Sequence, residues 1–177
     1  MYQRALAGKE KALGPEHTST LDTVHSLGVL YIKQGKLAEA EATFQQALAG
    51  KEKELGLEHK STLDTVHNLG ILYRNVGKLA EAEAMLQRAL AGYEKELGSE
   101  HTSTLDTVNS LGVLYINQDK LAEAEAMFRR ALAGKVKALG LEHKSTLDTV
   151  CNLCILYRMK AEAKAMLQQA PTTQPQQ

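Results

Sequence analysis

The chain has 177 residues, and its 21 basic and 21 acidic side chains give a formal net charge of zero. Proteins that bind nucleic acid usually carry excess basic residues to neutralise phosphates, so this balance argues against a nucleic-acid partner. No apolar run reaches the roughly 20 residues that span a bilayer. No leader of basic and then apolar residues opens the chain, and two cysteines make no disulfide framework. These features predict a cytoplasmic protein with no membrane partner.

The sequence repeats itself with a period of 42 residues. The segment Ser-Thr-Leu-Asp-Thr-Val occurs four times, with its leucine at Leu21, Leu63, Leu105 and Leu147. The segment Leu-Ala-Glu-Ala-Glu-Ala has the same spacing and begins at Leu37, Leu79 and Leu121. A fixed period in this range predicts a stacked array of repeats instead of one closed core.

Residues 1–13 match only the second helix of a repeat. In this segment Tyr2, Ala5 and Leu6 form an apolar face that no preceding helix of the chain covers. We therefore expect either that the chain is a fragment or that another copy buries its first helix.

The first helix of each complete repeat follows from apolar residues at helical spacing. Leu21, Val24, Gly28 and Tyr31 form one stripe of such a helix. Ser19 or Thr18 is predicted to cap its start, with the following aspartate completing a capping box. The aspartates at this position are accordingly assigned to capping and to the helix dipole, and they are Asp22, Asp64, Asp106 and Asp148.

A short turn at Gly35-Lys36 leads into the second helix. Its predicted buried stripe consists of Leu37, Ala40, Phe44, Ala47 and Leu48. Its predicted solvent face consists of Glu39, Glu41, Lys51 and Lys53. The helix should end near Leu55-Gly56, since glycine is favoured just past a helix end. Gly50 inside this helix suggests a close inter-repeat contact or a slight bend.

The fourth copy is defective. Four residues separate Tyr157 from Ala161, whereas seven separate Tyr115 from Ala122, so three residues of the turn between the helices are missing. We expect a degenerate repeat that caps the array. The predicted solenoid covers 1–170, with a half repeat at 1–16, repeats at 17–58, 59–100 and 101–142, a capping repeat at 143–170, and a disordered tail at 171–177.

The large and small residues of each copy resemble the tetratricopeptide repeat. In the first complete copy the matching residues are Val24, Leu27, Gly28, Tyr31, Ala40, Phe44 and Ala47. The 42-residue unit is similar to the repeats of kinesin light chains and to the repeat arms of fungal and bacterial NB-ARC nucleotide-switch proteins. The resemblance implies an all-α, right-handed superhelical solenoid of antiparallel helix pairs, with the first helices lining a concave face.

The resemblance also implies where a ligand would bind, namely at first-helix positions beside the packing stripe. Copies that agree almost everywhere differ at these positions, which suits a tuned recognition surface, although neutral drift at exposed sites would give the same variation. The candidate peptide-binding residues are His25, Val29, Lys33, His67, Asn68, Arg74, Asn75, Asn109, Asn117, Asn152 and Arg158.

The histidines and cysteines are not spaced in a way that predicts a metal site or a redox site. One histidine per repeat begins the Ser-Thr-Leu region, at His17, His59, His101 and His143. Neighbours would lie about 10 Å apart along the stack, too far to share a zinc ion, so these histidines are assigned to loop structure. Cys151 and Cys154 have Cys-x-x-Cys spacing, but Cys154 replaces a packing glycine and is predicted to be a buried small residue. We expect no catalytic residue, metal or cofactor.

The sequence therefore predicts a non-enzymatic scaffold that binds a protein or peptide on its concave face. One alternative is a structural module that self-assembles through the uncovered first helix, giving a homo-oligomer. Another is the sensor arm of a nucleotide-switch protein.

Overall fold

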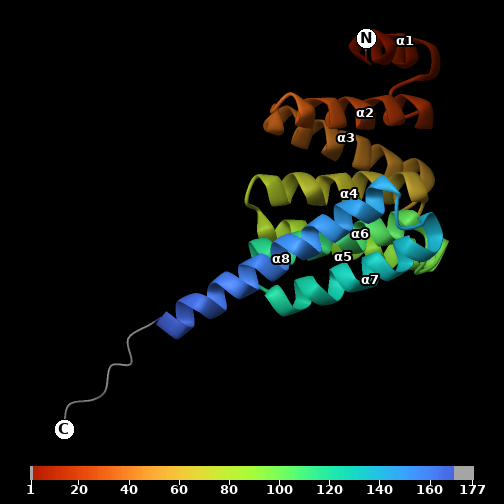
Figure 1. Cartoon of the computed structure of the whole chain (residues 1–177). Helices are drawn as coiled ribbons and strands as arrows, with labels where there is room; N and C mark the ends of the chain where they lie inside the picture. Colours follow the sequence, from red (N-terminus) through yellow and green to blue (C-terminus); the bar gives the residue numbers. More distant parts are fainter. Residues whose placement is uncertain (1, 170–177) are drawn as a thin grey trace.

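The computed structural model describes residues 2–169, which form eight α-helices and no strand (Figure 1). The all-α solenoid predicted from the repeats is confirmed. Within residues 2–169, no helix is both long enough and apolar enough to cross a bilayer. The helices are α1 (Tyr2–Leu13), α2 (Thr18–Lys33), α3 (Leu37–Leu55), α4 (Lys60–Asn75), α5 (Leu79–Leu97), α6 (Thr102–Asn117), α7 (Leu121–Leu139) and α8 (Lys144–Gln169).

The helices stack in chain order, and each packs against the helices before and after it. The pairs α2/α3, α4/α5 and α6/α7 are the three complete repeats, while α3, α5 and α7 also pack on the first helix of the next repeat. One core cluster consists of Ala40, Phe44, Leu69 and Leu72, which come from two successive repeats. Each repeat thus covers the apolar surface of its neighbour, and the core is continuous along the stack.

Two glycines allow the helices of a pair to approach each other closely. A Cβ atom placed on Gly28 would lie 2.9 Å from Cε1 of Phe44, and one on Gly50 would lie 2.5 Å from Cδ2 of Leu21. Both distances are far below van der Waals contact, so no larger residue fits without displacing the partner. Gly50 marks a contact within one repeat, which corrects the predicted inter-repeat contact.

Histidines, not serines or threonines, cap the first helices. His17 has an extended backbone, and its Nδ1 accepts a hydrogen bond of 3.2 Å from the Ser19 N–H. His59, His101 and His143 accept the same bond from Ser61, Ser103 and Ser145. The predicted capping box with Asp22 is therefore wrong, because the cap is His17, whose imidazole accepts from the Ser19 N–H.

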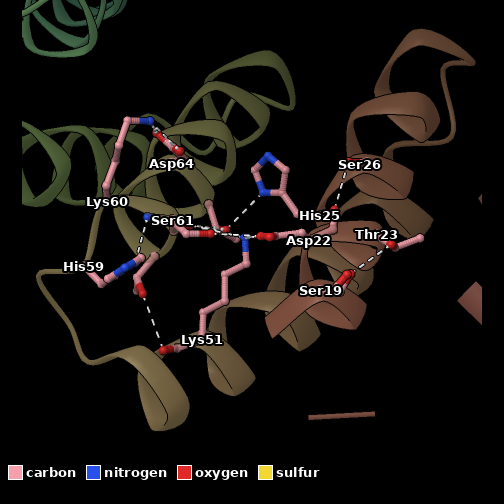
Figure 2. A network of polar contacts seen from close by, with 12 residues as sticks. Ser19, Asp22, Thr23, His25, Ser26, Lys51, His59, Lys60, Ser61 and Asp64 are labelled. Atoms are coloured by element: carbon pink, nitrogen blue, oxygen red, sulfur yellow. Dashed lines mark hydrogen bonds and ion pairs between the residues drawn. The ribbon is translucent and has the colours of Figure 1, made fainter. Parts of the chain in front are cut away.

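The aspartates predicted to cap these helices lie past the first turn, and Asp22 instead joins successive helices (Figure 2). Lys51 of α3, predicted to face water, is only 1% exposed, and its Nζ lies 2.9 Å from Oδ1 of Asp22. The Ser61 hydroxyl donates to the same carboxylate at 2.9 Å. Burial alone would raise the pKa of Asp22, but the hydrogen bonds and positive charge of Lys51, together with Ser61, lower it below its usual value.

The contact between the first-helix aspartate and the second helix recurs in each complete repeat, but the residue that binds the aspartate differs in one of them. In the third repeat Lys135 pairs with Asp106 at 2.7 Å. In the second repeat Tyr93 takes the lysine position, and its hydroxyl donates to Asp64 at 2.6 Å. The acidic ladder assigned to capping therefore holds the two helices of each complete repeat together.

The fourth repeat does not form a helix pair. Because the turn residues are missing, both of its segments form the single helix α8, which corrects the expected degenerate pair. In the part of the chain that the structure describes, no second helix folds back on α8, so Leu147 is 49% exposed, whereas its counterpart Leu21 is 1% exposed. Cys151 and Cys154 are also exposed, so the prediction of a buried Cys154 is wrong. The predicted tail, 171–177, lies outside the described residues.

Candidate functional site

The first helices of successive repeats form one continuous face. α2 contacts α4, α4 contacts α6, and α6 contacts α8, whereas in the described part of the chain the second helices α3, α5 and α7 make no such contacts with one another. Helices that approach each other on one side and diverge on the other give a curved stack. We refer to the face formed by α2, α4, α6 and α8 as the inner face.

Polar side chains connect neighbouring helices across the inner face. The Asn68 amide donates to Nε2 of His25 at 3.2 Å, so the proton of this neutral imidazole lies on Nδ1 and points to the Thr65 hydroxyl at 3.0 Å. The Thr65 hydroxyl in turn donates to the Ser61 carbonyl at 3.1 Å. One imidazole of α2 is thus held by two side chains of α4.

The same connection continues toward the end of the stack. His67 Nδ1 lies 3.0 Å from the Thr107 hydroxyl. One repeat further on, the Asn152 amide donates to Oδ1 of Asn109 at 3.2 Å. Burial is the main cause that lowers the pKa of both His25 and His67 to about 4, so both imidazoles are neutral at pH 7.

Five of the predicted peptide-binding residues are therefore occupied in joining repeats, and they are His25, His67, Asn68, Asn109 and Asn152. The sequence prediction missed their partners Thr65 and Thr107. Both threonines belong to the Ser-Thr-Leu-Asp-Thr-Val segment, whose invariance between copies was the available signal.

Other predicted residues have side chains that are open to solvent. Lys33, Asn75 and Asn117 are exposed at the C-terminal ends of α2, α4 and α6. Arg158 on α8 is also exposed and lies 3.7 Å from Glu162. Val29 is half-buried and packs against the core beneath the face. Exposed polar side chains therefore lie beside the half-buried Val29, and we refer to the apolar surface that contains Val29 as the floor of the inner face.

Arg74 combines burial with the lack of an acidic partner. Its guanidinium is half-buried on α4 and donates to Oδ1 of Asn75 at 3.1 Å, but no carboxylate within residues 2–169 forms an ion pair with it. Burial partly removes the guanidinium from water and thereby lowers the pKa of Arg74 below its usual value. By contrast, Arg88 and Arg130 each contact a glutamate.

Hollows in the surface lie elsewhere. One of about 280 Å³ lies between α1 and α2, and another of about 270 Å³ lies between α7 and α8. Neither contains any of the eleven predicted residues. Across residues 2–169, no group of three or more His, Cys, Asp or Glu side chains is placed to hold a metal ion.

Comparisons with known proteins agree with this geometry. A family model described as "Tetratricopeptide repeat" matches residues 1–53 and 61–137. A search of the curated proteins gave no match.

Solved structures give similar folds. A putative kinesin light chain of Podosopora anserina with nearly identical TPR-like repeats is 31% identical, with a TM-score of 0.72, and the match covers 95% of this chain and 81% of that chain. A variant of that protein gives a TM-score of 0.73 with the same identity and coverage. BtubC (BKLC) of P. vanneervenii is 21% identical with a TM-score of 0.76, covers 99% of this chain and 75% of its own, and supports the fold alone.

Proposed function

Because the chain belongs to the tetratricopeptide-repeat family, we propose that it is a non-enzymatic scaffold that binds a protein or peptide on its inner face. Repeats of this family generally mediate protein–protein interaction. The solved relatives at 31% identity carry the same kind of repeat over nearly the whole chain.

Arg74 is the observation that supports this function most directly. A half-buried guanidinium loses hydration, and that loss is offset only when an anion or several acceptors contact it. Asn75 supplies one neutral acceptor. A ligand carboxylate placed over α4 would supply the negative charge that Arg74 lacks. Lys33, at the C-terminal end of α2 in the preceding repeat, would be a second basic group for the same ligand.

We therefore propose a ligand segment that carries an acidic side chain beside apolar ones. The acidic group would face Arg74 and Lys33, and the apolar groups would lie on the floor that contains Val29. The inter-repeat bonds of His25 and His67 would keep neighbouring helices at a fixed spacing, so that the contact positions are set before the ligand arrives.

The test begins with a displayed library of random peptides selected on the wild-type protein. We expect the selected peptides to be enriched in Asp and Glu. Arg74→Glu should then weaken their binding by about 1.5–3 kcal/mol, or about 10- to 150-fold in Kd, as for loss of a hydrogen bond to a charged group.

The matched control is Arg4→Glu, which makes the same charge change on α1, outside the inner face, where the arginine is exposed and forms no ion pair among the described residues. It should leave peptide binding within about twofold of wild type. Selection of no peptide, or equal losses in both variants, would contradict binding on the inner face.

A further inference from the structure

Within residues 2–169, the first and the last helix of the stack each lack the partner helix that would complete a repeat. At the α8 end, α8 packs on α7 but no later helix among residues 2–169 covers its other side, so Leu147 is 49% exposed and Asp148 is exposed beside it. In the first complete repeat the equivalent Leu21 packs on Gly50 of the second helix, and Asp22, itself 60% exposed, pairs with Lys51 of the same helix.

At the other end, α1 has the sequence of a second helix and packs on α2, but among residues 2–169 no other first helix packs against it. Gly8 lies 42 residues before Gly50, and a Cβ atom built on Gly8 meets nothing within 4 Å. Lys9 is the counterpart of Lys51, and its Nζ donates to the Ser19 carbonyl at 3.0 Å, as Lys51 donates to Ser61 at 3.3 Å. Lys9 forms no ion pair with a carboxylate among the described residues.

We propose that α1 of one copy packs on α8 of a second copy and serves there as the missing second helix. The side chain of Leu147 would fill the space at Gly8, as Leu21 fills the space at Gly50. Asp148 would accept from Lys9 and from the hydroxyl of Ser19 of the other copy.

This contact reproduces two that the fold already contains. Asp22 binds Lys51 and the Ser61 hydroxyl, both at 2.9 Å. Asp106 binds Lys135 and, at 2.9 Å, the Ser145 hydroxyl. The apolar surface, the glycine notch and both charges at the two ends are therefore complementary, which singles out a second copy of this chain as the partner.

The contact joins different surfaces of the two copies, so each associated copy still presents one free end. Such a heterologous interface gives open chains instead of closed dimers. One difference sets the strength of the contact. Cys154 stands where Gly28 of a complete repeat lies against Phe44, and the counterpart of Phe44 at the α1 end is Tyr2, which is 46% exposed. The extra side chain holds the helices slightly apart, so we expect association weaker than the packing within a repeat.

The first experiment measures mass in solution against concentration, with a reductant present because the cysteines are exposed. The wild-type mass should rise from 19.4 kDa through successive multiples. Gly8→Ala should weaken association at least tenfold, since a Cβ atom at the equivalent Gly50 would lie 2.5 Å from leucine. The same variant should fold normally, because nothing in the single copy lies near that Cβ. A mass of one chain up to about 1 mM would overturn the proposal.

A second experiment tests the head-to-tail geometry with two blocked variants. Gly8→Leu blocks the α1 end and Leu147→Glu blocks the α8 end, so each alone should remain a single chain. An equal mixture should form a dimer and nothing larger. Leu57→Glu is the matched control, because Leu57 is 58% exposed in the loop between α3 and α4, and it should associate as wild type does. A mixture that stays monomeric would refute the pairing of α1 with α8.

Charge reversal gives a third, independent readout. Lys9→Glu and Asp148→Lys should each weaken association about tenfold, and the double variant should recover most of the loss because the pair is then reversed. If the double variant does not regain association, Lys9 and Asp148 do not form an ion pair at the interface. None of these variants touches Arg74, so peptide binding on the inner face and association of the ends can fail separately.

Discussion

The glycine between the two helices of the second repeat allows a quantitative test of the packing. A Cβ atom at Gly70 would lie 2.8 Å from Cγ of Leu86 and 3.3 Å from its backbone nitrogen. Because a backbone atom is involved, rotation of one side chain does not relieve the contact, and α5 must move away from α4. For Gly70→Leu we expect about 3 kcal/mol of overpacking, less about 1 kcal/mol gained in helix propensity. The net loss is about 2 kcal/mol or more.

The chain contains its own control for this substitution. Cys154 occupies the same repeat position on α8, where it is exposed because no second helix of the described residues covers it. Cys154→Leu should therefore change the free energy of unfolding by less than about 0.5 kcal/mol. Urea unfolding followed by circular dichroism, fitted with a nearest-neighbour repeat scheme, measures both variants. Equal stability of the two variants, or an unchanged midpoint for Gly70→Leu, would refute the assigned helix contact.

Further predictions concern the polar contacts. His25 and His67 have folded pKa values lowered from 6.5 to about 4, so stability should fall by up to about 3 kcal/mol per histidine as pH drops through this range, where the unfolded chain takes up protons first. Replacing both by Asn should flatten the profile measured by urea titration at each pH. Lys51→Ala should lower the free energy of unfolding by about 2 kcal/mol, whereas Lys51→Tyr should be within about 1 kcal/mol of wild type because Tyr93 already fills this position. His59→Ala should lower the melting temperature through a loss of about 0.5–2 kcal/mol, and His59→Asn should recover most of it; equal losses in the two variants would show that the cap contributes nothing.

The repeat period and the apolar spacing were enough to predict the fold. Leu21, Val24, Ala40, Phe44 and Ala47 are all buried as the helical stripes require. Repetition strengthened the prediction, since each stripe occurs at the same spacing in successive copies.

The polar contacts were harder to predict, because residue type does not reveal which partner a side chain finds. Lys51 follows Ala47 by four residues and thus lies on the buried stripe, but its charge suggested the solvent face. The occurrence of Tyr93 at the same position in the next repeat was the missed signal. A lysine and a tyrosine share a long apolar body with a polar tip, which suits a buried position near a carboxylate.

The helices that form the inner face could be predicted from the sequence, but the roles of several of their side chains could not. Variation between copies at His25, His67 and Asn109 suggested ligand contacts, whereas these side chains bind the neighbouring helix. In the contacts His25–Asn68 and Asn109–Asn152 only the first member differs, because either a histidine or an asparagine at that position can accept from the same asparagine of the next repeat. Side-chain contacts between repeats depend on how closely the helices pack. The residue type at one sequence position gives no information on that distance.

Near-identity of the copies has a consequence for how the polypeptide reaches its native state. A helix such as α3 meets almost the same surroundings on α2 as its counterpart α5 does on α4, so mispaired arrangements within one chain, and exchanged helices between two chains, differ little in energy from the native order. Short connections then decide the outcome, because a helix reaches its sequence neighbour long before it reaches a distant copy. We expect dilute chains to reach the native helix order and concentrated chains to exchange helices with one another. The yield of refolded protein should therefore fall as protein concentration rises.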